Sequence, residues 1–246
     1  MIDITEEDHR LWPPEHLIFP VGSLSLQVLP VDHPFHIAER LEAERNWLQE
    51  VDEKPALFNG QVVLQHRLTM DDGVIEGVGH LVPYSTFLWW RAQEPARGGF
   101  HLFGFPVLIS SDGAIIAIKM AAHTINAGKV YCAAGSLDKD DVANGACDLE
   151  GNMMREVLEE TGLELSSARA DEKLFASHRQ RRVTVYRRFH FDRTAEDLIA
   201  DIRAHMAIDD EQEIADVVAI RSNDPAAHNY DVAMLPLLTW IFGDGA

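Results

Sequence analysis

The stretch from Asp148 to Leu163 constrains this chain more than any other part, because it crowds three carboxylates onto one short helix. An aspartate can cap its start, and a glycine near its end can close it in the left-handed conformation. At about 100° per residue, Glu156, Glu159 and Glu160 fall within roughly a 100° sector. The opposite side is apolar, with Met154, Val157, Leu158 and Thr161. Like charges at this spacing repel, so the sequence predicts a helix over 148–161 with a positive partner on its acidic face.

A divalent metal ion is the partner that suits this helix. Hard cations take oxygen ligands, and Mg²⁺ is bound by one or two carboxylates together with substrate phosphates and waters. We therefore expect Mg²⁺ or Mn²⁺ at Glu156, Glu159 and Glu160. Arg155 stands four residues before Glu159 and can orient its carboxylate. The alternative is a solvated acidic face, which is the commoner meaning of three acids placed at random.

A family resemblance favours the metal site. Residues 155–163, Arg-Glu-Val-Leu-Glu-Glu-Thr-Gly-Leu, resemble the second half of the Nudix box, Arg-Glu-apolar-x-Glu-Glu-x-Gly-apolar. Five fixed positions would match by chance in roughly one of 10⁴ such chains. Gly128-Lys129 and residues 133–138 are similar to the strand and glycine loop that lead into the box. In that family the loop supplies a main-chain carbonyl and an acid to the metal, and the counterparts are Ala134 and Asp138.

The first half of the box departs from the family pattern. The segment from Gly135 to Arg155 is longer by six residues, and Cys147 stands where the family has a supporting glutamate. That carboxylate is therefore absent, or it is provided by Asp148, Asp141 or Glu150. The resemblance still implies a pyrophosphohydrolase in which carboxylate-bound metal activates water and neutralises a diphosphate.

Two further groups of residues are candidates for the chemistry. The direct base is Glu156 or an acid of the segment 207–213, among which Glu213 ranks first. Arg179, Arg182 and Arg187 belong to the densest basic cluster and can clamp phosphates, although surface salt bridges explain them equally well. Strand alternation allows at most one of Arg187 and Arg188 to reach a given cleft.

Composition limits the partners. With 40 acidic and 21 basic side chains the net charge is −19, which disfavours a nucleic acid polymer and leaves a small nucleotide substrate. The two cysteines, Cys132 and Cys147, are too few for a disulfide framework, which favours a reducing compartment. We expect no signal peptide, because the first residues are neither basic nor apolar. The apolar run 233–242 is too short to cross a bilayer. We expect a cytoplasmic protein without membrane partners, and a homodimer stays open because family members often dimerise.

Periodicity and turn residues predict an α/β protein. The resemblance implies a Nudix α/β/α sandwich over residues 99–246, preceded by an α+β extension over residues 1–98. The expected helices are 34–50, 148–161, 195–206 and 231–242. In the first of them, Ile37, Leu41, Trp47 and Leu48 are expected to pack inward. The expected strands are 61–68, 74–82, 106–110, 114–120, 128–133, 182–191 and 214–220, and the segment 135–145 is expected to be a loop.

The substrate and the rival functions are less constrained. Residues 54–60 resemble a segment of Nudix hydrolases that act on UDP-sugars, which favours UDP-glucose or a related compound. The alternative is a helix stop with a buried Leu57-Phe58 pair. Tyr84 and Trp89-Trp90 are candidates for stacking on a base, or else belong to the core. The rivals are a Nudix isomerase acting on a prenyl diphosphate, a catalytically silent nucleotide sensor and an acidic interaction protein.

Overall fold

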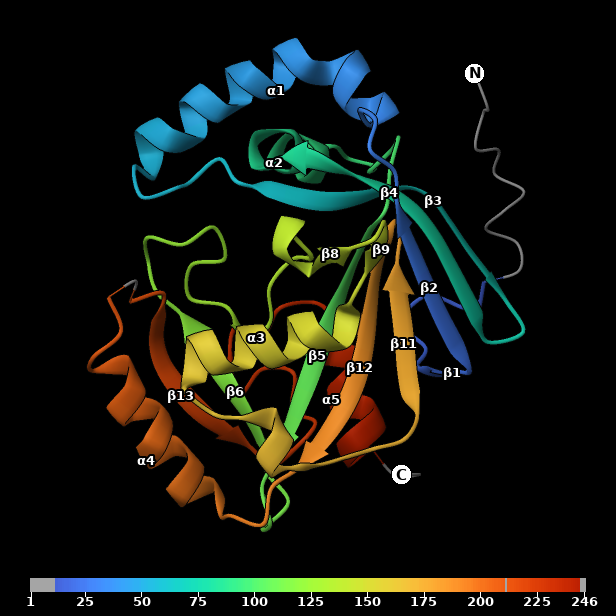
Figure 1. The fold of residues 1–246 in the computed structure, drawn as a ribbon. Helices are drawn as coiled ribbons and strands as arrows, with labels where there is room; N and C mark the ends of the chain where they lie inside the picture. The colour runs from blue at the N-terminus through green and yellow to red at the C-terminus, as the bar shows by residue number, and fades with distance from the viewer. Residues whose placement is uncertain (1–11, 211, 244–246) are drawn as a thin grey trace. The chain divides into compact units, whose positions relative to one another are not determined.

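A computed structural model describes residues 12–210 and 212–243, and within them the chain forms two compact units (Figure 1). Unit 1 contains the chain up to Phe103 and two later segments, Ser136–Leu149 and Ala176–Thr184. Unit 2 contains Gly104–Gly135, Glu150–Phe175 and the chain from Val185 onward. The units therefore interleave along the sequence, and the predicted division at residues 98 and 99 stays a prediction.

Within the described residues, unit 1 is built on a sheet of five strands in the order β3-β4-β2-β9-β8. The antiparallel hairpin of β3 (Gln61–Asp71) and β4 (Val74–Pro83) confirms the predicted turn at Asp72-Gly73. β2 (Ser23–Val28) runs parallel to β4 and antiparallel to β9 (Ala146–Cys147). The expected loop 135–145 is more ordered than predicted, since it holds the 3₁₀ helix η2 (Lys139–Asp141) and the strand β8 (Val142–Ala143).

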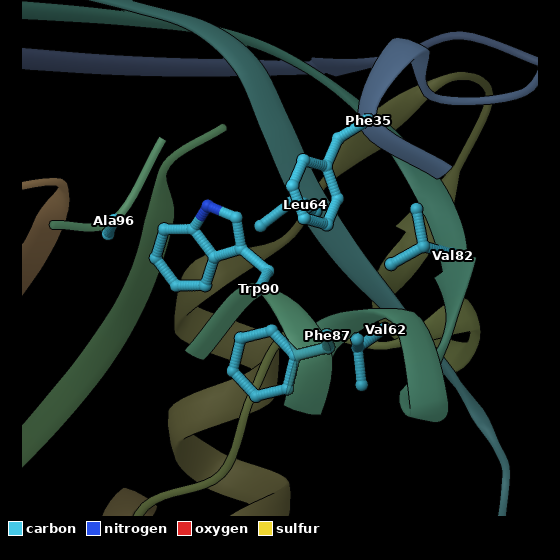
Figure 2. Close-up of a cluster of buried hydrophobic side chains, with 7 residues drawn as sticks. All are labelled: Phe35, Val62, Leu64, Val82, Phe87, Trp90 and Ala96. Atoms are coloured by element: carbon cyan, nitrogen blue, oxygen red, sulfur yellow. The ribbon is translucent and has the colours of Figure 1, made fainter. Parts of the chain in front are cut away.

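Two helices cover this sheet and enclose an apolar core. α2 (Tyr84–Ala92) contacts β3 and β4, and α1 (Pro34–Glu53) packs on α2. Figure 2 shows the buried cluster between them, formed by Phe35, Val62, Leu64, Val82, Phe87, Trp90 and Ala96. Trp89 packs partly buried against the cluster, and its Nε1 donates to Glu39 Oε2 of α1 at 3.1 Å. Trp90 is therefore a core residue and is not free to stack on a ligand.

The sequence does not predict α2. Its aromatic residues favour strand structure and follow β4 without a break. The side chain of Asn59 accepts a hydrogen bond from the Ser85 N–H at 2.8 Å, which satisfies one of the free donors at the helix start. Because this cap comes from a residue 26 positions away, local sequence patterns do not reveal it.

The α1 helix is confirmed, but its predicted inward face is wrong. Three of the four residues expected to pack inward point outward: Ile37, Leu41 and Leu48 are 67%, 63% and 68% exposed. The fourth, Trp47, is half-buried. The fully buried side chains of α1 are instead Phe35 and Ala43. The core under α1 therefore uses a different face of the helix from the one that carries Ile37, Leu41 and Leu48.

Across residues 12–210 and 212–243, the larger sheet has eight strands. Its order is β1-β11-β12-β5-β6-β13, with β10 beside β12 and β7 beside β6. The bounds are β1 (Phe19–Val21), β5 (His101–Ile109), β6 (Ile115–Met120), β7 (Val130–Tyr131), β10 (Arg169–Ala170), β11 (Leu174–Arg179), β12 (Arg182–His190) and β13 (Ile214–Ile220). The predicted hairpin of β5 and β6, the long strand β12 and the strand β13 are confirmed. The short strands β1 and β10 carry no alternating pattern that would predict them.

Helices lie on both faces of the sheet in unit 2 (Figure 1). They are α3 (Leu149–Thr161), α4 (Ala195–Met206) and α5 (Met234–Phe242), and the 3₁₀ helix η3 (Leu165–Ser167) follows α3. Successive side chains of β12 lie on opposite faces of the sheet. Arg187 forms an ion pair with Glu150 of α3 at 2.6 Å, whereas the guanidinium of Arg188 lies 4.8 Å from the ring centre of Trp240 in α5. The predicted α/β sandwich with a preceding α+β region is thus confirmed.

No helix in the described part of the chain combines the length and the apolar character needed to cross a bilayer.

A group of buried histidines holds the start of α1 in unit 1. His33 is the N-cap of α1, and its Nδ1 accepts from the Phe35 N–H at 3.0 Å. His80 is bonded through Nδ1 to the Val31 carbonyl at 2.7 Å and through Nε2 to His66 Nδ1 at 2.8 Å. Burial, followed by the nearby His80, lowers the pKa of His33 to about 3. The cap is therefore a neutral imidazole throughout the ordinary pH range.

Acid should destabilise the protein through this cap. The unfolded chain protonates His33 near pH 6.5, while the folded chain keeps it neutral down to about pH 3. Stability from this group is therefore lost as the pH falls through this window, by about 1.4 kcal/mol per pH unit. Asparagine caps helices without titrating, so His33→Asn should flatten the dependence of unfolding free energy on pH between about pH 6 and 4. Urea unfolding at several pH values measures this slope, and the exposed His123→Asn is the control that should leave it unchanged.

Candidate active site

The end of α3 is closed by two features. Gly162 adopts a φ of +70°, as predicted for the C-terminal glycine, and its N–H donates to the Leu158 carbonyl at 2.9 Å. His205, in the last turn of α4, donates from Nε2 to the Glu159 carbonyl at 2.8 Å. A Cβ at position 162 would lie 2.8 Å from the His205 ring, so glycine also allows this contact. The last turn of α3 is therefore fixed from outside the helix.

The buried face of α3 differs from the prediction. Met154 and Leu158, expected to be inside, are 42% and 47% exposed. The buried side chains are Leu149, Asn152, Met153, Val157 and Thr161. This rotation of the face carries Glu156 and Glu160 inward and leaves Glu159 exposed. The three carboxylates therefore do not share one solvated face.

Glu156 lies against the main chain of the preceding loop. Its Oε1 accepts from Arg155 at 3.0 Å and lies 3.5 Å from the amide nitrogen of Asn152. A Cβ added at Gly135 would overlap the Glu156 carboxylate, so this close approach requires glycine. Asn152 is fully buried and was not predicted as a site residue, because an uncharged side chain in a helix interior carries no sequence signal. Together these contacts fix the Glu156 carboxylate.

Glu160 is the most perturbed carboxyl group of the site. Its Oε2 is buried and has no hydrogen-bond partner. Burial raises its pKa well above the usual range, and the charges of Glu156 and Glu213 add to the shift. A hydrogen bond from the Ala134 main chain opposes it. In the isolated chain Glu160 is therefore held as a neutral acid beside two other carboxylates.

Glu213 and Tyr131 complete the group. Glu213 directly precedes β13, and its carbonyl accepts from the Ala121 N–H at 2.8 Å. The buried hydroxyl of Tyr131 accepts from Asn126 at 3.2 Å, and burial together with the Glu160 charge raises its pKa. Glu213 was predicted from its place in an acidic segment, whereas Tyr131 was missed because it lies in a short apolar strand. The neighbouring candidate acid, residue 211, lies outside the described residues.

Arg155 links the buried and the exposed carboxylates. Its guanidinium forms ion pairs of 3.0 Å with Glu156 and with Glu159, whose side chain is 58% exposed. The contact between Arg155 and Glu159 is thus present, and its role in orienting Glu159 stays a prediction. Exposed pairs of this kind add little stability, so the pairing serves mainly to place the guanidinium over Glu156.

The acidic side chains of the loop before α3 form structural hydrogen bonds. Asp138 caps η2, and the buried Asp141 side chain accepts from the Asp138 N–H at 2.9 Å. Burial, with Asp141 nearby, raises the pKa of Cys147 to about 12. Cys147 is therefore a neutral thiol that cannot replace the family's glutamate, and Glu150 forms its ion pair with Arg187.

The three predicted phosphate clamps are divided between the two units. Arg187 is in unit 2, where it bonds Glu150 and donates from Nε to the Asp171 carbonyl at 3.1 Å. Arg179 and Arg182 belong to unit 1. Arg179 is exposed, and Arg182 lies 3.4 Å from the Arg91 carbonyl. A role of these arginines on substrate stays a prediction.

The carboxylates of Glu156, Glu160 and Glu213 suit a divalent cation by their chemistry. In residues 12–210 and 212–243, no three His, Cys, Asp or Glu side chains already stand in a metal-binding arrangement. The donor chemistry nevertheless suits Mg²⁺ or Mn²⁺, because Glu156, Glu160 and Glu213 offer only oxygens. The buried Glu160 oxygen without a partner and the crowding of like charges are features that a cation would relieve. The residues fit the ion, and its binding stays a prediction.

Comparisons with known proteins show only distant likenesses. No protein-family profile matches the chain, and no curated protein sequence matches it. Among solved structures, the MutT protein from Methanosarcina mazei Go1 aligns with a TM-score of 0.38 at 13% identity, over 58% of this chain and 92% of that one. DR0079 from Deinococcus radiodurans gives a TM-score of 0.42 at 11% identity, over 62% and 95%. The E. coli ORF135 protein gives 0.33 at 17%, over 56% and 87%. These values are too low to assign a family.

Gly135→Ala should damage the site without unfolding the protein. The added methyl displaces the Glu156 carboxylate, which is the flexible end of a side chain. We expect Mn²⁺ affinity, measured by electron paramagnetic resonance, to fall about ten- to hundredfold, as for other losses of ligand support. Gly22→Ala is the matched control, because its Cβ would make only an ordinary 3.7 Å contact. Unchanged Mn²⁺ binding in Gly135→Ala would show that Glu156 is not a ligand.

Proposed function

We propose that this chain is a metal-dependent hydrolase of the Nudix type, which cleaves the diphosphate linkage of a nucleoside diphosphate derivative. One observation carries the proposal. The carboxyl of Glu160 is buried without a partner for Oε2, near Glu156 and Glu213. It lies on the helix whose sequence resembles the Nudix box. A protein that needed only a stable helix would gain by an apolar residue at this position.

The chain's own residues hold the carboxylate of Glu156 in place. Arg155 and Asn152 hold one oxygen of Glu156, and Gly135 lets that carboxylate reach the loop. Glu156 and Glu160 are the residues that would hold Mg²⁺ or Mn²⁺, with the Ala134 main chain beside them and Glu159 at the exposed margin. When bound, such an ion lowers the pKa of a coordinated water and neutralises charge on the diphosphate.

A proton must also be taken from the attacking water. Glu213 is exposed and stands at the end of a loop that leads into β13, so its carboxylate is accessible to solvent. Glu156 is held by two donors and is the less mobile of the two candidates. We therefore assign the base to Glu213 and an orienting, ion-binding role to Glu156.

The favoured substrate is a UDP-sugar. Residues 54–60 resemble a segment of hydrolases that act on such compounds. Of the alternative explanation, the helix stop is present, since α1 ends at Glu53, whereas the burial of Phe58 is not. Phe58, which would be buried in a simple helix stop, is 83% exposed, so its ring is not needed for the core.

The rival functions differ in their products. The silent sensor is disfavoured by the three box glutamates, which a binding protein would not need. An isomerase acting on a prenyl diphosphate would convert its substrate without releasing phosphate or a nucleoside monophosphate. An acidic interaction protein would show no dependence on metal.

A substrate panel tests the proposal directly. UDP-sugars, ADP-ribose, dinucleotides and nucleoside triphosphates are incubated with Mg²⁺, with Mn²⁺ and with EDTA, and products are separated by chromatography. We expect UMP release from UDP-glucose that depends on metal and stops in EDTA. Release of a different nucleoside monophosphate would keep the reaction and replace the substrate. Absence of turnover on every compound would refute the enzyme assignment.

Glu160→Gln should abolish activity and stabilise the metal-free protein. Because the pKa of Glu160 is raised by folding, the unfolded chain releases its proton above about pH 4.5 while the folded chain retains it. Metal-free stability is therefore lost as the pH rises, by up to about 1.4 kcal/mol per pH unit. The variant should lack this contribution and lose at least about a hundredfold in turnover. Calorimetry and the chromatographic assay measure both, with the exposed Glu172→Gln as control. Full activity in Glu160→Gln would contradict the proposed role.

A further inference from the structure

The turn between β11 and β12 has an uncommon backbone conformation. Gln180 and Arg181 connect the two strands, and Gln180 has a φ of +51°. Few residues other than glycine adopt this left-handed region. Two carboxylates hold the turn, since Glu15 accepts from the Gln180 N–H at 2.5 Å and Glu94 accepts from its Nε2 at 3.3 Å. Backbone strain that the surrounding structure maintains in this way is frequent at binding sites.

The second residue of the turn, Arg181, packs onto an aromatic ring of unit 1. Its guanidinium lies over Phe100, 4.7 Å from the ring centre, and Phe100 is fully buried. The Nη1 atom of Arg181 is buried, and no residue in 12–210 or 212–243 gives it a hydrogen-bond acceptor. The ring stabilises the positive charge, but stacking does not supply an acceptor to an N–H donor.

No carboxylate compensates this guanidinium. Burial lowers the pKa of Arg181, and no neighbouring acid opposes the shift. Glu15 and Glu94 are bonded to the adjacent Gln180 instead. Surface salt bridges, the alternative explanation of the basic cluster, therefore do not account for Arg181. A charge that is partly removed from water in this way is costly unless a partner of opposite charge binds it.

The surroundings of the turn are locally positive. Arg179 and Arg182 border it, and Arg182 lies 3.4 Å from the carbonyl of Arg91. The charged residues placed here by sequence or by contact are Arg91, Arg179, Arg181 and Arg182 against Glu15 and Glu94. Such an excess of positive charge, in a chain whose net charge is −19, concentrates small anions at this place.

We propose that Arg181 binds an oxyanion at this turn, the carboxylate or phosphate group of a small molecule. Guanidinium groups bind both kinds of group through paired N–H donors. The anion would supply the acceptor that Nη1 lacks, and the fixed turn reduces the loss of side-chain freedom on binding.

This site is separate from the three predicted phosphate clamps, because Arg181 is not one of them. The residues that form it belong to unit 1, whereas the carboxylates of the candidate active site belong to unit 2. The proposal therefore does not depend on the proposed function, and its test needs neither metal nor nucleotide.

Titration of nitrogen-15-labelled protein tests the site. Sodium phosphate and sodium acetate are added separately at a constant ionic strength of about 0.15 M, and the N–H resonance of Arg181 Nε is followed. We expect a saturable shift with a dissociation constant of about 1 mM, as for a ligand with few contacts. Tighter binding of phosphate identifies a phosphate ligand, and tighter binding of acetate identifies a carboxylate.

Thermal unfolding of variants tests the residue. At about ten times the dissociation constant, the anion should raise Tm by about 3 °C above sodium chloride of equal ionic strength. Arg181→Gln should lose this increase, and Arg181→Lys, which keeps the charge without the planar fork, should lose most of it. Arg45→Gln makes the same change of net charge as Arg181→Gln, at an exposed position on α1, and should keep the full increase. Each variant is compared with itself in chloride, so a change in its basal stability does not affect the result.

Two results would overturn the proposal. One is a response of Arg181 to both anions that never saturates, which is a general salt effect. The other is an equal increase in Tm for the unmodified chain, Arg181→Gln and Arg45→Gln, which would place the bound anion elsewhere on the molecule.

Discussion

The burial of Glu160 beside two other carboxylates is the constraint around which unit 2 is arranged. A carboxyl group removed from water stays protonated or requires a positive neighbour. The surrounding structure brings like charges near it, together with one main-chain hydrogen bond. Gly135 and Asn152 then act on Glu156, so that its carboxylate approaches from a fixed direction. Burying Glu160 near other carboxylates costs free energy, and a bound cation would offset that cost by supplying positive charge.

In unit 1, by contrast with Glu160, a group of histidines is held by hydrogen bonds. His33, His66 and His80 form a polar group in which the imidazoles are bonded to each other or to the main chain. Burial lowers the pKa values of His33 and His66, which favours their neutral forms. In unit 1 these two imidazoles therefore stay uncharged and serve the fold, whereas unit 2 holds a buried acid whose pKa is raised. The difference separates residues that support the fold from residues that are candidates for chemistry.

The sequence predicts elements well where local signals and tertiary structure agree. The bounds of α4 and β13 match the expectation, because Thr194 caps the helix and strong apolar patterns define both elements. Prediction fails where the deciding contact is distant. The start of α2 depends on Asn59, and the approach of Glu156 to the preceding loop depends on Gly135, which a helical wheel does not include. The apolar residues Ile37, Leu41 and Leu48 of α1 were recognised, but periodicity alone assigned them to the wrong face of the helix.

The hydrogen bond from His205 to the Glu159 carbonyl has a consequence for how this protein can evolve. It ties the last turn of α3, which carries Glu159 and Glu160, to the end of α4. A substitution along α4 that shifts His205 by a fraction of an ångström would move these carboxylates with it. Selection can therefore adjust the chemistry from an outer helix, by changes that leave every carboxylate of the site in place.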